Sequence, residues 1–405
     1  MLAPKLRFKE FNDEWNYKLF NEIFEFIQNN SFSRDMLNYS ENSKIYNIHY
    51  GDILTKYGEI IDFNIISNII PKINNDISLS KFEDKSYLKN GDIIIADTAE
   101  DLTVGKSCEV VNLHCKALAG LHTIPCRPKF KFASQYLGEY INSTSYHSQL
   151  IPYITGIKVS SISKTSIIKT KIYFPTIKEQ EKISKLFSLL NKKIELQQRK
   201  IEVLKMYKRG LIHKIFDYNK NISNQYKISE CINIFDRKTT KNNEFTILSS
   251  TKDGIKIQDD YFNRQTASEN NIGYKIIPRN YITYRSMSDT GDFYFNIQNI
   301  IDIGIVSPAY PVFNTIDTID INYFINYINF SSQFKNQILI NKEGGTRFAL
   351  SISKFSDLVI ELPEYEIQLY YSRIISNTDK KIIVGENKLK NLDALKKSLL
   401  QQMFI

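Results

Sequence analysis

Apolar residues recur at seven-residue intervals in two stretches of the chain, residues 186–216 and residues 374–404. The first stretch and the residues just before it carry two rows: Phe187, Ile194, Ile201 and Ile215, and Ile183, Leu190, Leu204 and Leu211. The second carries Ile375, Ile382, Leu389 and Met403, with Tyr371, Leu392 and Leu399. A seven-residue repeat makes a narrow apolar stripe that a second helix covers by knobs-into-holes packing. The pattern predicts two long helices, the first about 58 Å long at 1.5 Å per residue.

The two stretches are copies of one another, a constant 188 positions apart. Identical residues recur in register, including Lys192 and Lys380, Lys193 and Lys381, Leu204 and Leu392, and Leu211 and Leu399. The stripe is interrupted at the same two heptad places, by Gln197 and Gly385 and by Lys208 and Lys396. We expect the helices to pack against each other with these interruptions as shared weak layers. The alternative is two ordinary surface helices on separate cores.

Short apolar runs broken by Gly and Asn fill the chain before and between the long helices, and their length and β-branched content predict strands. The second globular segment replays the first: residues 323–329 parallel residues 136–142, and a Ser-Ile-Ser-Lys sequence occurs in both. We predict an α+β chain built by tandem duplication of one globular domain plus one long helix. The predicted segments are residues 1–175, 176–217, 218–362 and 363–405.

The net charge of +9 is concentrated in the long helices, where residues 178–216 carry +7 and residues 364–404 carry +2. A basic excess favours an acidic partner such as nucleic acid. Since the globular segments are neutral on average, any surface in them that binds a polyanion must come from the arrangement of side chains. No stretch is long and apolar enough to span a bilayer, and four cysteines without a secretion signal indicate reduced thiols in a cytosol.

Two weak enzyme signals have simpler explanations. Asp76 with residues 83–85 faintly matches a metal-dependent nuclease centre, yet an exposed turn accounts for these charges. His114, Cys115, His122 and Cys126 offer nitrogen and sulfur ligands without the paired spacing of structural zinc. Glycine-rich nucleotide loops and an Asn-Pro-Pro-Tyr methyltransferase signature are absent from the sequence. We therefore predict neither a metal site nor a catalytic centre.

Two divergent globular domains that alternate with two similar long helices resemble the specificity (S) subunit of type I restriction–modification systems. The resemblance covers essentially the whole chain. It also rests on the Pro-x-x-x-Glu-Gln sequence at residues 175–180, on the Asn/Asp-Lys-Lys-Ile sequences at residues 191–194 and 379–382, and on the turns at residues 155–158 and 344–347. Gly385, inside the second helix, should cost about 1 kcal/mol relative to Ala and leaves the stiffness of that helix in doubt.

The resemblance implies a pseudo-twofold protein whose globular parts are target-recognition domains. Each would read one half of a bipartite, asymmetric sequence in double-stranded DNA, and the helices would form an antiparallel coiled coil that sets the distance between the half-sites. It implies docking of methyltransferase (M) subunits, two per S subunit, and of restriction (R) subunits in the larger complex. S-adenosylmethionine, ATP and Mg²⁺ are expected on those partners only, in the cytoplasm.

Candidate DNA contacts lie on loops at equivalent places in the two modules. Lys158 and Arg347 occupy the two small-residue turns, and Arg347 has the fork of donors that matches guanine O6 and N7. The other candidates are Thr346, Lys106, Arg285, Ser286, Tyr57 and Lys252. Each could instead be a solvated or turn-forming side chain.

Lys192, Lys193, Lys380 and Lys381 lie away from the main seam rows, as docking residues for a partner or as a solvated face. We interpret the chain as a DNA-binding subunit without catalysis of its own. The alternatives are a fused-type restriction enzyme, meaning a nuclease or methyltransferase carrying recognition domains, and a coiled-coil scaffold without DNA specificity.

Overall fold

A computed structural model describes the chain except for residues 1, 41, 157, 219–222, 259–269 and 342–347. The described residues separate into two compact units. Unit 1 contains Met1–Gln198 and Asn387–Ile405, and unit 2 contains Arg199–Glu386. Each unit therefore combines one globular domain with part of both long helices.

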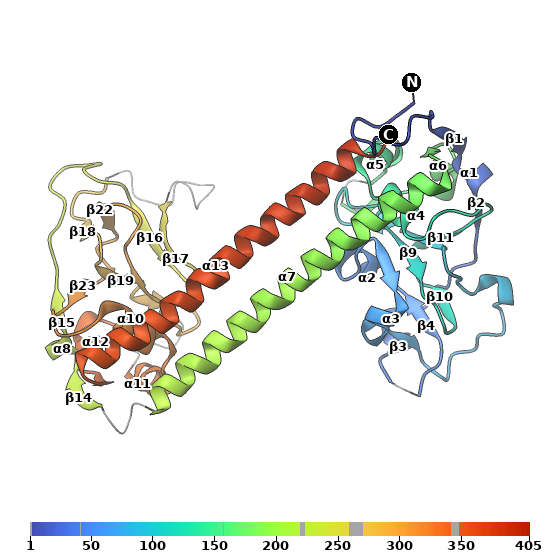
Figure 1. The fold of residues 1–405 in the computed structure, drawn as a ribbon. Helices are drawn as coiled ribbons and strands as arrows, with labels where there is room; N and C mark the ends of the chain where they lie inside the picture. Colours follow the sequence, from blue (N-terminus) through green and yellow to red (C-terminus); the bar gives the residue numbers. More distant parts are fainter. Residues whose placement is uncertain (1, 41, 157, 219–222, 259–269, 342–347) are drawn as a thin grey trace. The chain divides into compact units, whose positions relative to one another are not determined.

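The globular domain of unit 1 is built on a five-stranded sheet (Figure 1). Its strand order is β2 (Phe24–Phe26), β11 (Thr123–Pro128), β7 (Ile93–Ala96), β9 (Ser107–Val111) and β5 (Ile60–Asp62). A four-stranded sheet has the order β10 (Ala117–Ala119), β4 (Tyr46–Ile48), β6 (Lys72–Ile73) and β3 (Leu37–Asn38). The two-stranded pairs are β1 (Asn16–Leu19) with β13 (Lys171–Phe174), and β8 (Thr98–Ala99) with β12 (Ser160–Ser161). The short helices include α2 (Tyr50–Thr55), α3 (Phe63–Ile66), α4 (Tyr136–Ile141), α5 (Thr144–Leu150) and α6 (Lys164–Ile167).

The globular domain of unit 2 has a four-stranded central sheet. Its order is β15 (Ile232–Ile234), β23 (Val312–Thr315), β19 (Ile282–Tyr284) and β21 (Phe295–Ile297). The two-stranded pairs are β14 (Asn224–Lys227) with β25 (Val359–Leu362), β16 (Leu248–Thr251) with β17 (Gly254–Ile257), β18 (Lys275–Pro278) with β22 (Ile303–Val306), and β20 (Met287–Ser288) with β24 (Phe348–Ala349). The helices include α8 (Ile228–Cys231), α10 (Ile321–Phe330), α11 (Ser332–Asn341) and α12 (Ile352–Ser356).

The central strand pairs repeat in register. Ile94 of β7 is paired with Pro125 of β11, and Ile282 of β19 is paired with Phe313 of β23. Both members of the second pair lie 188 positions after their counterparts, which is the offset of the helices. The duplication predicted from sequence therefore extends into the sheets, and the predicted α+β class is confirmed.

The long helices are α7 (Ile177–Tyr218) and α13 (Tyr365–Gln402). In unit 1 the rings of Phe187 and Phe404 stack 5.7 Å apart. In unit 2 Lys205 pairs with Glu386, and Lys208 pairs with Asp379, each at 2.6 Å. Because residue numbers rise along α7 while they fall along its partner, the pairing is antiparallel, as predicted. Helix α13 continues through Gly385 without a break.

The expectation that the two lysines form a shared layer is wrong, because each finds its partner within a different unit. Lys208 pairs with Asp379 of α13 in unit 2, and Lys396 pairs with Glu59 at 2.6 Å in unit 1. Each lysine has a carboxylate partner that its heptad position alone does not indicate. Gln197 is buried, with 8% of its surface exposed.

Candidate nucleic-acid interface

Lys158 is the one predicted contact of unit 1 that lies open to solvent. It belongs to the turn before β12, where Thr155 and Ser161 exchange two backbone hydrogen bonds of 3.0 and 2.8 Å. This turn continues into the β8–β12 pair, at the end of the central strand β7. Lys158 is thus placed on an exposed loop beside the strand ends of the sheet.

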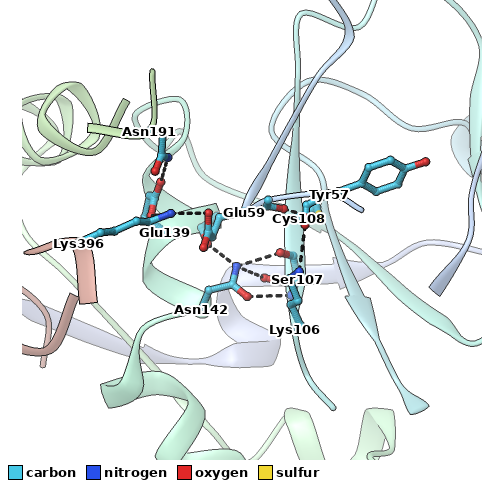
Figure 2. A network of polar contacts seen from close by, with 11 residues as sticks. Tyr57, Glu59, Lys106, Ser107, Cys108, Glu139, Asn142, Asn191 and Lys396 are labelled. Carbon is cyan, nitrogen blue, oxygen red and sulfur yellow. Dashed lines mark hydrogen bonds and ion pairs between the residues drawn. The ribbon is translucent and has the colours of Figure 1, made fainter. Parts of the chain in front are cut away.

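Tyr57 and Lys106 face inward, which corrects their prediction as DNA contacts. The Tyr57 side chain is buried, with 3% exposed, and burial raises the pKa of its phenol. The Lys106 ammonium donates to the main-chain carbonyls of Leu54 at 3.2 Å and Tyr57 at 3.0 Å (Figure 2). Lys106 therefore fastens the end of α2 to strand β9, and neither side chain is presented to a duplex.

A buried polar network joins the same domain to the two long helices (Figure 2). Lys396 of α13 lies 2.6 Å from Glu59 and 3.9 Å from Glu139 of α4. Asn191 of α7 donates to Glu139 at 2.7 Å. Burial raises the pKa of Glu139 to about 7, whereas the ammonium of Lys396 lowers that of Glu59 despite its desolvation. The network fixes the globular domain of unit 1 to the parts of α7 and α13 in the same unit.

In unit 2, Arg285 is exposed and follows the last residue of β19. Its neighbour Ser286 is half-buried, and its hydroxyl donates to the carbonyl of Ala309 at 2.7 Å. Lys252 is exposed in the turn between β16 and β17. Thr346 and Arg347 lie outside the described residues, so their role stays a prediction.

The four predicted docking lysines are exposed, and each pair has an exposed apolar neighbour one turn further along its helix. Leu196 follows Lys192 and Lys193 on α7 with 55% of its surface exposed, and Val384 follows Lys380 and Lys381 on α13 with 66% exposed. Residues three and four apart share one helix face. We call Lys192, Lys193 and Leu196 patch A, and Lys380, Lys381 and Val384 patch B. Their members are equivalent at the 188-residue offset.

The sequence placed the loop that begins at Asp97 after a central strand, and we considered His122 only as a zinc ligand, so the contact between these two side chains was missed. Asp97 follows β7, and its carboxylate accepts from the Thr98 hydroxyl at 2.8 Å and lies 3.4 Å from Nδ1 of His122. In unit 2 the corresponding position beside Arg285 is occupied by Tyr310. Burial raises the phenol pKa of Tyr310, and the charge of Arg285 offsets part of this rise. Their position after the central strands selects the loops, but it does not select these side chains within them.

No group of three or more His, Cys, Asp or Glu is arranged to hold a metal ion in the described part of the chain. Of the four residues considered for zinc, Cys126 is fully buried and His114 contacts the carbonyl of Asn112 at 3.0 Å. Asp76 and residues 83–85 do not form such a group either. Among the described helices, none is long and apolar enough to cross a membrane.

Residues 12–206 match the family model described as type I restriction modification DNA specificity domain. A curated protein of Methanocaldococcus jannaschii, named for the specificity subunit of the type I restriction enzyme MjaX, is 25% identical over 232 residues. That alignment covers 56% of this chain and 51% of the relative, so it spans about half the length of the curated protein.

Two solved structures share the fold along nearly the whole chain. The S subunit of a type I restriction–modification system from M. genitalium aligns with a TM-score of 0.58 and 12% identity, over 100% of this chain and 99% of that one. A chain from a structural study of complex assembly and conformational transition of the type I R-M system aligns with a TM-score of 0.59 and 12% identity, over 96% and 97%. The resemblance to type I specificity subunits is thus confirmed by the family model over residues 12–206 and by the curated relative, and the two solved structures share the fold.

Proposed function

We propose that this chain is the DNA-reading subunit of a type I restriction–modification enzyme, with one half-site read by the globular domain of each unit. The observation that carries the proposal is the duplicated sheet with divergent loops. The paired strands β7–β11 and β19–β23 keep one register, while the side chains at their ends differ in charge. A constant frame with variable loops is how a scaffold positions recognition residues for different targets. The target is then bipartite and asymmetric.

The test is methylation mapping. The chain is co-expressed with the methyltransferase encoded beside it, and the host DNA is sequenced for methylated bases. We expect a motif of two unlike halves with a fixed gap, lost when this chain is deleted and altered in one half when residues 218–362 are exchanged for those of a related chain. Methylation that does not depend on this chain would refute the proposal.

Patches A and B are the proposed docking sites for two methyltransferase subunits. Each combines two exposed lysines with an aliphatic side chain that is more than half exposed, so a partner could bury the aliphatic group while the lysines stay at the rim of the interface. Equivalent patches on two helices suit two copies of one partner, and restriction subunits would join the larger complex.

The side-chain charges that bind DNA phosphates make the affinity for DNA fall steeply as the salt concentration rises, whereas the preference for one base sequence over another persists.

Docking is tested with Leu196→Asp, Val384→Asp and the double variant, measured by the mass of the purified complex. We expect each single variant to lose one methyltransferase copy and the double variant to lose both. Gln198→Asp adds the same charge at an exposed position of α7 on the helix face opposite patch A and should keep both copies. Full assembly by the double variant would exclude the patches as docking sites.

We propose that the chain has no catalysis of its own, and that S-adenosylmethionine, ATP and Mg²⁺ act on the partner subunits. The purified chain should neither cleave DNA with Mg²⁺ nor transfer a methyl group. Methyl transfer should be seen only when the chain is in complex with its methyltransferase. Activity of the isolated chain would instead favour a fused-type enzyme. DNA binding that is blind to sequence would favour a scaffold.

A further inference from the structure

The end of strand β7 in unit 1 forms a fixed polar corner. Asp97 is the first residue after the strand, and its backbone is held on both sides: its N–H donates to the carbonyl of His122 at 3.1 Å, and its carbonyl accepts from Ile162 at 2.9 Å. Its Oδ1 accepts from the Thr98 hydroxyl. The carboxylate is thus aimed by two neighbouring strands, while 26% of the side chain stays open to solvent.

His122 completes this corner. Its Nδ1 lies 3.4 Å from both the Asp97 carboxylate and the Thr98 hydroxyl, and 47% of its side chain is exposed. Its backbone has a φ of 54°, which is uncommon for a residue other than glycine. The edge of the Tyr50 ring packs against the imidazole, with centroids 5.2 Å apart. The imidazole and the carboxylate are therefore presented together and in one orientation.

Unit 2 has the corresponding corner with different chemistry. Arg285 is the first residue after β19, as Asp97 is after β7, and Tyr310 stands where His122 stands, both at the 188-residue offset. Leu350 donates to the carbonyl of Ser286 at 2.9 Å, whereas its counterpart Ile162 donates to that of Asp97.

Unit 2 therefore has one extra residue at this corner. One residue lies between Ala96 and the strand at Thr98, but two lie between Tyr284 and the strand at Met287. An extra residue at a strand end re-aims the side chains beside it. In this corner the extra residue lets Ser286 take the bond to Ala309, while the side chain of Arg285 is left exposed.

The two corners have opposite hydrogen-bonding character. A carboxylate at Asp97 only accepts hydrogen bonds, and a guanidinium at Arg285 only donates them. In the major groove, a carboxylate matches the exocyclic amine of cytosine, and an arginine matches O6 and N7 of guanine with two parallel bonds. The described ends of the central strands thus differ in the base edge that each can recognise.

We infer that these corners are base-reading positions: Asp97, oriented by His122, reads the amine of a cytosine in the half-site of unit 1, and Arg285, beside Tyr310, reads a guanine in the half-site of unit 2. The inference rests on the proposed function and deepens it by naming one specificity residue in each domain. Asp97 and Arg285 contact the bases, while His122 acts as a positioning residue.

The test uses Asp97→Asn and Arg285→Gln in the full chain, co-expressed with its methyltransferase and read by methylation sequencing. Both replacements are close in size to the native side chain, and both present the amide that matches adenine N6 and N7. We expect methylation of the native motif to fall by roughly tenfold or more. We also expect one position of one half-site to change, from cytosine to adenine in Asp97→Asn and from guanine to adenine in Arg285→Gln.

Two controls remove single charges elsewhere on the exposed surface. Glu83→Gln deletes a carboxylate with 72% exposure, and Lys241→Gln deletes a cation in unit 2. Both should change overall affinity and salt dependence slightly and leave every base of the motif unchanged. His122→Gln should relax the preference at the Asp97 position without affecting the other half-site.

An unchanged motif at native efficiency in both principal variants would overturn the inference, because no base would then depend on these side chains. If either variant methylates nothing, its assembly with the methyltransferase and its binding to randomised half-sites are measured. An assembled complex that still prefers the native base overturns the inference. A wild-type complex without any bipartite motif would refute the proposed function itself, which is a separate result.

Discussion

The globular domains of units 1 and 2 are held on the long helices by the same aromatic trio. In unit 1 Phe404 packs on Tyr136 and Tyr140, with ring centroids 5.9 and 5.6 Å apart. In unit 2 Phe216, which is 188 positions earlier, packs on Tyr323 and Tyr327, at 5.8 and 5.1 Å. The end of α7 thus enters the core of one domain, and the end of α13 enters the core of the other.

The units differ in where the equivalent lysines find their partners. In unit 1 Lys396 reaches from α13 into the globular domain, to Glu59 and Glu139. In unit 2 Lys208 pairs across the helices with Asp379, the counterpart of Asn191. Asn326 of α10 stands where α4 has Glu139. The carboxylate has therefore moved from the domain to the helix, and unit 2 relies on apolar packing where unit 1 adds a buried ion pair.

The largest effects should come from truncating the shared aromatic anchor. We expect Phe404→Ala and Phe216→Ala each to cost about 3–5 kcal/mol, because both rings are buried in a core. Hydrogen exchange should rise in α4 for Phe404→Ala and in α10 for Phe216→Ala. Phe130→Ala removes a ring that is 50% exposed and should change little. Equal losses of protection in both helices for each variant would contradict separate anchoring.

Replacing the lysines should separate the two units. Lys396→Met leaves Glu139 buried without its cation, which should cost about 3 kcal/mol of local stability. Lys208→Met removes a partly exposed pair, whose Asp379 is 41% exposed, and should cost less than about 1 kcal/mol. Denaturant melts and hydrogen exchange of α4 and α10 measure the difference. Similar costs for both lysines would mean that the Glu139 site is not the stronger anchor.

The buried carboxyl of Glu139 should make the stability of unit 1 depend on pH between about 5 and 8. The pKa of Glu139 rises to about 7 in the folded chain, so the unfolded chain releases this proton first, and stability falls as pH rises from about 5 to 8. Glu139→Gln should remove a loss on the order of 2 kcal/mol over this window. The comparison is made as the difference between the two proteins, because Glu109 has a similarly raised pKa in both. A difference that stays constant with pH would contradict the raised pKa of Glu139.

The smallest effect is expected from converting unit 2 to the arrangement of unit 1. In Asn326→Glu combined with Asp379→Asn, the carboxylate moves back to the domain while Lys208 stays. Since Asn326 is only half-buried, we expect a net change within about 1 kcal/mol. Thermal unfolding of the double variant and of each single variant measures their coupling. If the stability change of the double variant equals the sum of the changes of the two single variants, Lys208 does not form a new pair with the carboxylate at position 326.

Much of the fold could be predicted because it depends on periodicity and repetition. The seven-residue rows predicted the two helices, and the 188-residue offset between them predicted the duplication. The match of residues 136–142 with residues 323–329, at an offset of 187, predicted the equivalence of Tyr136 with Tyr323. The seven-residue rows predicted burial less well for individual residues. Ile194 and Leu204 are only partly buried, although Phe187 and Ile201 are buried.

The polar sites could not be predicted as well, because their partners are distant in sequence. Lys106 has the composition of a loop contact, yet its ammonium is taken up by carbonyls about fifty positions earlier. Lys396 interrupts an apolar row, and only the folded chain brings Glu59 to it. Asp97 and His122 are 25 positions apart and meet because strands β7 and β11 are neighbours. Local sequence carries no signal for such meetings.

The first and last parts of unit 1 are stitched together, since Leu6 donates to the carbonyl of Gln402 at 2.9 Å and Trp15 packs edge-on to Phe404 at 6.4 Å. Because the first residues of the chain contact its last residues within unit 1, joining the two would not disturb the packing of that unit. A circular permutant that begins at Ser223, with a short linker joining residue 405 to the segment before Leu6, would retain the contacts within each unit. Such a permutant would place the globular domain of unit 2 first in the chain, where it could be exchanged as a terminal cassette.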